Sequence, residues 1–127
     1  MIDSMRRFKA GVFQALSHPT RIAIIEHLCS GEMSVGRLCE KIGIEQSNAS
    51  QHLAVLRNKH LVETRKSGNQ ILYRLRDPSL ATVFEALRRF FLSHLTEILA
   101  MLREEQQEGE EPTKPDKPNR PKKTVRA

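Results

Sequence analysis

One stretch of the chain has the composition of a surface that reads hydrogen-bond patterns. Residues 46–57 read QSNASQHLAVLR, a polar half rich in amides and hydroxyls followed by an apolar half. On a helix that turns about 100° per residue, Ala49 and Leu53 share one face and Gln51 lies opposite them. The outward face therefore starts with uncharged polar groups and carries the cation Arg57 about two turns later.

Such a face suits a recognition helix in the major groove of DNA. Asn and Gln can bond adenine through two hydrogen bonds, Ser bonds several base edges, and flanking cations neutralise phosphates. An ordinary solvated helix start has a similar composition, because Ser and Asn favour caps. The predicted DNA-binding residues are Ser47, Asn48, Ser50, Gln51, His52, Arg57, Arg65, Lys66 and Asn69.

A catalytic serine–histidine pair is the competing chemistry for this stretch. Two positions apart on a helix, Ser50 and His52 point about 160° away from each other, so no hydrogen bond can join them. The sequence also lacks a nucleophile elbow and a glycine-rich phosphate loop. We therefore predict no enzymatic activity, and we expect His52, at the edge of the apolar face, to be packed and hydrogen-bonded.

Composition predicts one small basic domain with a tail. The 127 residues are 39% hydrophobic and carry a net charge of +6. Residues 104–127 hold six acidic and six basic residues, so residues 1–103 carry the whole excess, fifteen basic against nine acidic. A basic domain favours polyanions, most commonly nucleic acid, although a merely soluble basic protein has the same balance.

Cysteine content and hydropathy predict a cytoplasmic protein with no membrane partner. Cys29 and Cys39 are too few for a disulfide scaffold, and no secretory signal pattern is present at the N-terminus. The longest apolar-rich run, residues 90–102, is about half the length that spans a bilayer.

Apolar spacing predicts four helices in the first half of the chain. Pro19 suits the first turn of the second helix, which Ser17 or His18 would cap. Ser34 is expected to cap the third helix and Gly43 to end it. The helices are expected near residues 8–16, 19–30, 35–42 and 46–59.

Beyond residue 60 the pattern changes. Residues 61–66 and 70–75 predict a β-hairpin joined by Ser67-Gly68-Asn69, with a basic tip that could contact phosphates or the minor groove. Apolar residues then recur at helical spacing over residues 79–103, which predicts one long helix. Residues 104–127 are poor in apolar residues and predict a disordered charged tail.

The long helix carries more apolar surface than a small domain can cover. The first helix offers a companion surface, so a twofold dimer would bury both and place two recognition helices about 34 Å apart. Burial within one chain is the alternative. The predicted interface residues are Phe8, Val12, Phe84, Leu87, Phe91, Leu95 and Ile98.

The order of these elements predicts a winged helix-turn-helix. Two short helices across a tight turn, followed by a hairpin, define this fold, which is mainly α with a β-hairpin wing (α+β). Residues 1–103 would form the DNA-binding domain, with its N- and C-terminal helices at the dimer interface. Double-stranded DNA and a second copy of the chain are the expected partners.

Three segments carry a resemblance to a known family. They are ALSHPTRIAIIEHL (15–28), MSVGRLCEKIGIEQSNASQHLAVLRNKHLV (33–62) and ILYRL (71–75), and they resemble the ArsR/SmtB family of bacterial winged-helix repressors. The resemblance covers residues 8–91 and implies a homodimer that binds a palindromic operator and changes its grip when an effector binds. Residues 65–69 match the wing. The positions that match the recognition helix are Ser47, Asn48, Ser50, Gln51 and His52.

The metal-sensing positions of that family are changed in this chain. Where arsenic sensors carry Glu-Leu-Cys-Val-Cys-Asp-Leu-Cys, residues 32–39 read EMSVGRLC and keep only the last cysteine. The zinc-sensing positions fall at Asp77 and Ser79 and near Phe90 and Ser93, which cannot complete the four-ligand shell of zinc. We therefore predict no metal site and no cofactor.

Two alternatives remain open. Cys29 and Cys39 could approach each other and sense a metalloid, sulfide or an oxidant through thiol chemistry, although free cysteines often serve only as small apolar residues. The polar helix could instead dock on a protein partner. DNA binding would fall steeply with salt, and this separates it from protein docking.

Overall fold

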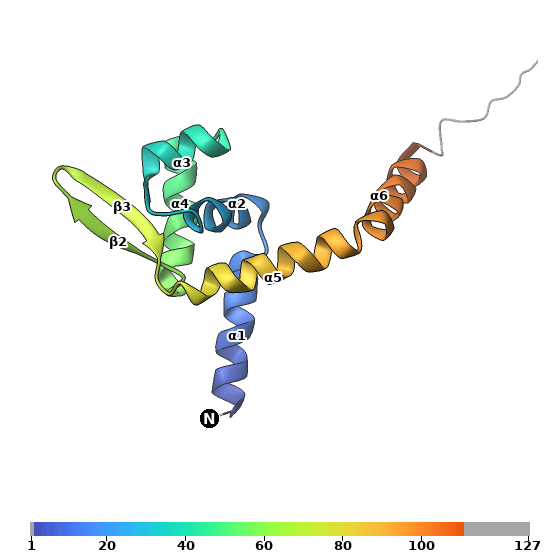
Figure 1. Cartoon of the computed structure of the whole chain (residues 1–127), viewed down its shortest axis with the longest axis horizontal. Coiled ribbons are helices and arrows are strands. Elements are labelled where there is room, and N and C mark those ends of the chain that lie inside the picture. Colours follow the sequence, from blue (N-terminus) through green and yellow to red (C-terminus); the bar gives the residue numbers. More distant parts are fainter. Residues whose placement is uncertain (1, 111–127) are drawn as a thin grey trace, which may run out of the picture. The chain divides into compact units, whose positions relative to one another are not determined.

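The computed structural model describes residues 2–110, over which six helices and three strands follow one another (Figure 1). The chain divides after Ala86 into two compact units, and α5 spans the division. The elements are α1 (Ile2–Leu16), α2 (Pro19–Leu28), β1 (Met33–Ser34), α3 (Val35–Ile42), α4 (Gln46–Asn58), β2 (Val62–Ser67), β3 (Gln70–Leu75), α5 (Ser79–Ser93) and α6 (Leu95–Glu110).

Local signals in the sequence place the ends of the helices that carry the site. His18 caps α2, its side chain accepting a hydrogen bond from the backbone N–H of Thr20 at 3.1 Å. Ser34 caps α3 in the same way, and Gly43 ends that helix in the left-handed conformation, at φ 82°. The predicted caps of both helices are confirmed.

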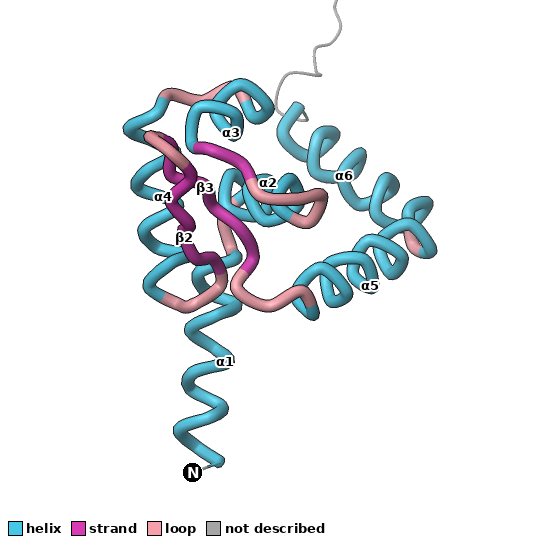
Figure 2. The backbone as a smooth tube through the Cα atoms, turned by 60° about the vertical axis from the view of Figure 1, so that its left-hand side comes forward, coloured by secondary structure: helices cyan, strands magenta, loops and turns pink. Residues whose placement is uncertain are grey.

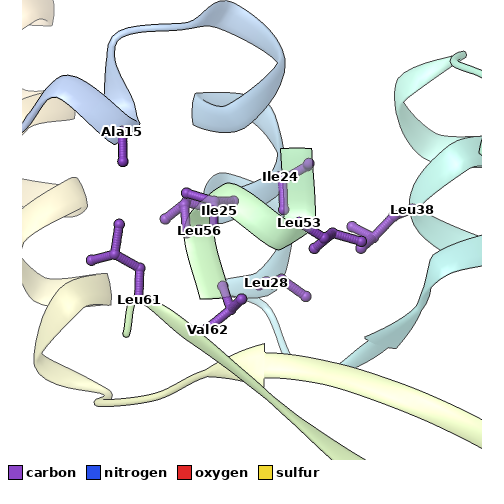
Figure 3. Close-up of a cluster of buried hydrophobic side chains, with 9 residues drawn as sticks. All are labelled: Ala15, Ile24, Ile25, Leu28, Leu38, Leu53, Leu56, Leu61 and Val62. Carbon is purple, nitrogen blue, oxygen red and sulfur yellow. The ribbon is translucent and has the colours of Figure 1, made fainter. Parts of the chain in front are cut away.

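Helices α2, α3 and α4 enclose one hydrophobic core in the first unit. Figure 3 shows its side chains converging from α1, α2, α3 and α4 and from the start of β2. Burying a residue of Leu or Ile size contributes about 1.5–3 kcal/mol, so these contacts hold α4 in place. The cluster consists of Ala15, Ile24, Ile25, Leu28, Leu38, Leu53, Leu56, Leu61 and Val62.

The hairpin β2–β3 projects from these helices and belongs to a three-stranded antiparallel sheet (Figures 1 and 2). The strand order is β1-β3-β2, with Tyr73 paired to Met33 on one side and Thr64 on the other. The turn is one residue shorter than predicted, because Ser67 pairs with Gln70 and only Gly68 and Asn69 connect the strands. Gly68, at φ 62°, occupies the position that a type II′ turn needs at positive φ.

The short strand β1 was not predicted. Two residues carry no detectable periodicity, and Met33-Ser34 forms a strand only because β3 lies beside it to accept the pairing. The first helix also starts earlier than predicted, at Ile2 rather than Phe8.

The prediction of one helix over residues 79–103 is wrong. The helix is interrupted at His94, which separates α5 from α6. Ser93 Oγ donates to the carbonyl of Arg89 at 2.9 Å, and His94 Nδ1 lies 2.8 Å from the carbonyl of Phe90. Side chains that bond the carbonyl four residues earlier compete with the backbone ladder, and this weakens the helix at that point.

The predicted start of the disordered tail at residue 104 is also too early. Helix α6 continues to Glu110, because glutamate, glutamine and arginine are good helix formers and extend a helix nucleated by the apolar turn before them. Residues 111–127 of the predicted tail lie outside the described residues. Over residues 2–110, no helix is both long and apolar enough to cross a bilayer.

Candidate nucleic-acid interface

Helix α4 presents its polar residues outward because its apolar residues are anchored. Ala49, Leu53 and Leu56 are at most 1% exposed, whereas the side chains of Ser47 and Gln51 are exposed to solvent. The predicted orientation of this helix is confirmed. Gln46, Asn48 and Ser50 are exposed as well, so the first two turns of α4 display five amide or hydroxyl side chains.

Capping does not consume these polar side chains. The N-cap of α4 is Glu45, and no side chain bonds the free N–H groups of its first turn. Within residues 2–110, the side chains of Ser47, Asn48 and Gln51 form no hydrogen bond with the rest of the chain. They therefore differ from ordinary cap residues and are available to a partner.

His52 differs from the other predicted contacts because it is tied to the domain. Its Nδ1 lies 3.3 Å from Nη1 of Arg21, and its ring lies 4.4 Å from that of His18. Arginine can only donate, so Nδ1 must accept and the neutral ring carries its proton on Nε2. Burial, then His18 and Arg21, lower the pKa of His52. The expected packed and hydrogen-bonded histidine is confirmed.

Arg21 connects three helices at this point. Its Nε donates to the carbonyl of Ala15 at the end of α1, while its Nη1 approaches His52 on α4. Helix α4 is thus held at the start of α2 by polar contacts as well as by the core.

In the β2–β3 wing, by contrast with α4, two charged side chains are paired with other residues. Arg65 forms two hydrogen bonds with the carboxylate of Glu32, one of them 3.0 Å long, and lowers the pKa of Glu32 through them. Arg74 bonds Glu63 at 2.8 Å. Of the predicted wing contacts, Lys66 and Asn69 are exposed at the tip and form no side-chain bond or ion pair within residues 2–110.

Between α4 and β3 the surface is hollowed. The hollow has a volume of about 330 Å³ and is lined by Ser50, Leu53, Ala54, Arg57, Asn58 and Tyr73. Asn58 and Tyr73 were not predicted as contacts. The helical wheel places Asn58 on the same outward face as Gln51, and this was the available signal. Alternation along residues 70–75 puts Tyr73 on the same face as Ile71 and Leu75, an apolar face that gives no such signal.

The residues predicted at a dimer interface fall into two groups. Val12 and Phe84 are half-buried and pack against the core of the first unit. Ile98 is half-buried too. The remaining residues are exposed apolar side chains, namely Phe8, Leu87, Phe91 and Leu95, each 40–52% exposed.

Of the two cysteines, Cys29 shows no sign of activation. Both are half-buried free thiols, and the pKa of Cys29 is raised by burial and then by the charge of Glu26. A raised pKa disfavours the reactive thiolate at neutral pH. Among residues 2–110, no three His, Cys, Asp or Glu side chains are grouped to hold a metal.

Comparison with known proteins agrees with this geometry. A model of the family described as "Bacterial regulatory protein, arsR family" matches residues 18–64, which span α2 to the start of β2. The HTH-type transcriptional regulator Rv0081 of Mycobacterium tuberculosis is 35% identical over 103 residues, covering 80% of this chain and 90% of that protein. The chain belongs to the ArsR family.

Two further relatives bear on the assignment. The biofilm growth-associated repressor of Xylella fastidiosa is 44% identical over 82 residues, covering 65% of this chain and 72% of that protein. The crystal structure of the transcriptional repressor BigR, also from Xylella fastidiosa, matches at 40% identity with a TM-score of 0.64, over 71% of this chain and 92% of the other. The homodimeric winged helix-turn-helix DNA-binding domain of Mb0332 from Mycobacterium bovis matches with a TM-score of 0.70 at 27% identity, over 75% and 88% of the two chains.

These relatives are transcriptional regulators built on the winged helix-turn-helix fold. The fold predicted from the order of helices and hairpin is confirmed, as is the family. This ArsR-family chain is accordingly a regulatory DNA-binding protein and not an enzyme.

Proposed function

We propose that the protein is a homodimeric, sequence-specific repressor that binds a palindromic operator and uses no metal. The observation that carries the proposal is the outward face of α4, where amide and hydroxyl side chains are exposed and unbonded within residues 2–110. A surface that must read base edges needs donors and acceptors that the protein itself leaves free.

The polar residues of α4 and of the wing tip divide into those that would contact bases and those that would contact phosphates or orient the helix. Ser47, Asn48 and Gln51 are placed to bond base edges in the major groove. Arg57 and Lys66 are exposed cations that would neutralise phosphates. His52, bound to Arg21, orients the helix and leaves only its Nε2 side for DNA.

A second copy of the chain would cover the exposed apolar side chains. Phe8 on α1 and Phe91 on α5 are 50% and 52% exposed, which is costly for side chains of this size in water. Mb0332, a structural neighbour, is homodimeric. Twofold symmetry in the protein would match a palindrome in the DNA.

We propose no metal site because Asp77, a position that matches a zinc ligand of the family, has another role here. This residue matches a zinc ligand in the resemblance, but its Oδ1 accepts a hydrogen bond from the N–H of Ser79 at 2.9 Å. That bond lowers the pKa of Asp77 and starts helix α5. We assign Asp77 a capping function, and we place the repressor with its DNA in the cytoplasm.

A gel-shift titration with the DNA upstream of its own gene tests the proposal. We expect binding at least about a thousandfold tighter than to random duplex at physiological salt, the lower end for specific regulators. Equal affinity for both duplexes would rule out sequence-specific repression. Affinity for a captured protein partner with no steep salt dependence would favour the protein-docking alternative.

A further inference from the structure

The hollow between α4 and β3 lies where a DNA backbone would have to pass. Arg57, Asn58 and Ser50 line it from the recognition helix, and Tyr73 lines it from the wing. If the helix enters the major groove and the wing reaches the neighbouring minor groove, one sugar–phosphate strand separates the two elements. That strand must run through the space between helix and wing.

The chemistry of the hollow suits a phosphate oxygen. Arg57 supplies a guanidinium, Asn58 an amide N–H₂ and Tyr73 a phenolic O–H, all of which donate hydrogen bonds. Within residues 2–110, none of these three side chains forms a hydrogen bond or ion pair with another residue. The buried side chain of Leu53 closes the floor of the hollow.

The charges around the wing make Arg57 the main attraction for an anion at this position. Arg65 and Arg74, the arginines of β2 and β3, are neutralised by Glu32 and Glu63. No carboxylate lines the hollow, so nothing there would repel a phosphate.

Resting on the proposed function, we propose that this hollow seats one backbone phosphate of the operator in each half-site. Arg57, Asn58 and the hydroxyl of Tyr73 are its ligands. Tyr73 lies in the central strand of the sheet and Asn58 at the end of α4, so the phosphate joins helix to wing and sets the register of Gln51 on the bases.

Phosphate scanning tests this assignment. Duplexes that carry the operator with one neutral methylphosphonate at each successive position are titrated with the wild type, Tyr73→Phe and Asn58→Ala. We expect the wild type to lose about tenfold at one phosphate per half-site, as removing a hydrogen bond to a charged group predicts. Each variant should lose a similar factor on intact operator and then lose little more at that same phosphate.

Gln106→Ala is the matched control, because Gln106 is an exposed amide on α6, which belongs to the second unit and does not line the hollow. It should bind like the wild type throughout. Thermal unfolding of every variant checks the fold, and Tyr73→Phe keeps the ring that packs against the core.

Two results would overturn the assignment while leaving the repressor intact. One is a wild type that binds the operator specifically while both variants stay as sensitive as the wild type to a methylphosphonate at every position, because Asn58 and Tyr73 would then bind none of these phosphates. The other combines two observations: free inorganic phosphate competes with the operator for the wild type but not for Tyr73→Phe, and methylphosphonates have no effect at any particular position. The hollow would then bind a small free anion and not a backbone phosphate. If the wild type shows no specificity, the proposed function fails. Equal affinity of the wild type, Tyr73→Phe and Asn58→Ala for random duplex would then also refute the phosphate seat.

Discussion

Helix α4 and the β2–β3 wing would both face DNA, yet they hold their polar groups in opposite states. The outward side chains of α4 form no bonds within residues 2–110, whereas Arg65 and Arg74 of the wing are each paired with a carboxylate. Free groups can be matched to bases without first breaking a bond. A paired arginine must exchange its carboxylate for a phosphate, and the net gain is small. We therefore expect α4 to supply most of the specificity and the wing mainly to position the protein on the duplex.

The largest effect on stability and DNA binding should come from removing a buried side chain that holds α4 against the core. Leu56 is fully buried, so Leu56→Ala should destabilise the domain by about 2–5 kcal/mol and abolish specific binding at 37 °C. Urea unfolding measures the loss. Val55→Ala, on the same helix but 37% exposed, is the control and should cost far less. Similar losses for both variants would mean that α4 is not held by its apolar face.

Changing a base-contacting residue and a phosphate-contacting residue of α4 should separate sequence specificity from overall affinity for DNA. Gln51→Ala should lose about 1–3 kcal/mol on the operator and almost nothing on random duplex. Arg57→Ala should weaken both duplexes alike and reduce the salt slope by about 1. Arg103→Ala, which removes an equal charge from α6, controls for net charge. Parallel losses for Gln51→Ala and Arg57→Ala on every sequence would refute this division.

Freeing the wing arginine should change affinity by a smaller factor. Glu32→Gln leaves Arg65 without its carboxylate, so DNA binding should tighten a few-fold on all sequences, with a steeper salt dependence. Fluorescence anisotropy over a salt series measures both. Glu40→Gln, which removes an exposed carboxylate paired with Arg37 at 3.5 Å, is the charge-matched control. If the two variants behave alike, the pairing of Arg65 has no effect on binding.

The smallest effect concerns pH and His52. Its pKa in the folded protein is lowered, so the unfolded chain binds the proton more readily. Stability from this residue is therefore complete above the ordinary pKa of about 6.5 and is lost as pH falls below it. The urea midpoint should fall slightly from pH 7.5 to pH 5.5 in the wild type and less in His52→Gln. An equal fall in both proteins would place the titration on another group.

Repeating patterns explain why the sequence predicted the recognition helix so closely. The spacing of Ala49, Leu53 and Leu56 is a property of one short segment, and the caps His18 and Ser34 act on the next few residues. Signals of this kind are local, and they are confirmed here. The assignment of individual side chains to DNA and to the dimer stays a prediction.

The predictions from sequence fail where contacts between distant residues, or competing local contacts, determine the secondary structure. The interruption at His94 depends on two side chains taking backbone carbonyls, against an apolar spacing that continues through it. The helical end of α6 at Glu110 depends on propagation from the preceding turns rather than on the polar composition of that segment. Strand β1 exists only beside β3.

The sequence by itself determines the positions of α2, α3 and α4, the caps of α2 and α3, the outward polar face of α4 and the hairpin. Each of these features arises from side chains within a few positions of one another. The pairing of Glu32 with Arg65, 33 positions apart, and of Arg21 with His52, 31 positions apart, required the folded domain. So did the meeting of Asn58 and Tyr73 at one hollow. Periodicity predicts which face of a helix is polar. Only the folded structure shows which polar and charged side chains are left without a hydrogen-bond or ion-pair partner.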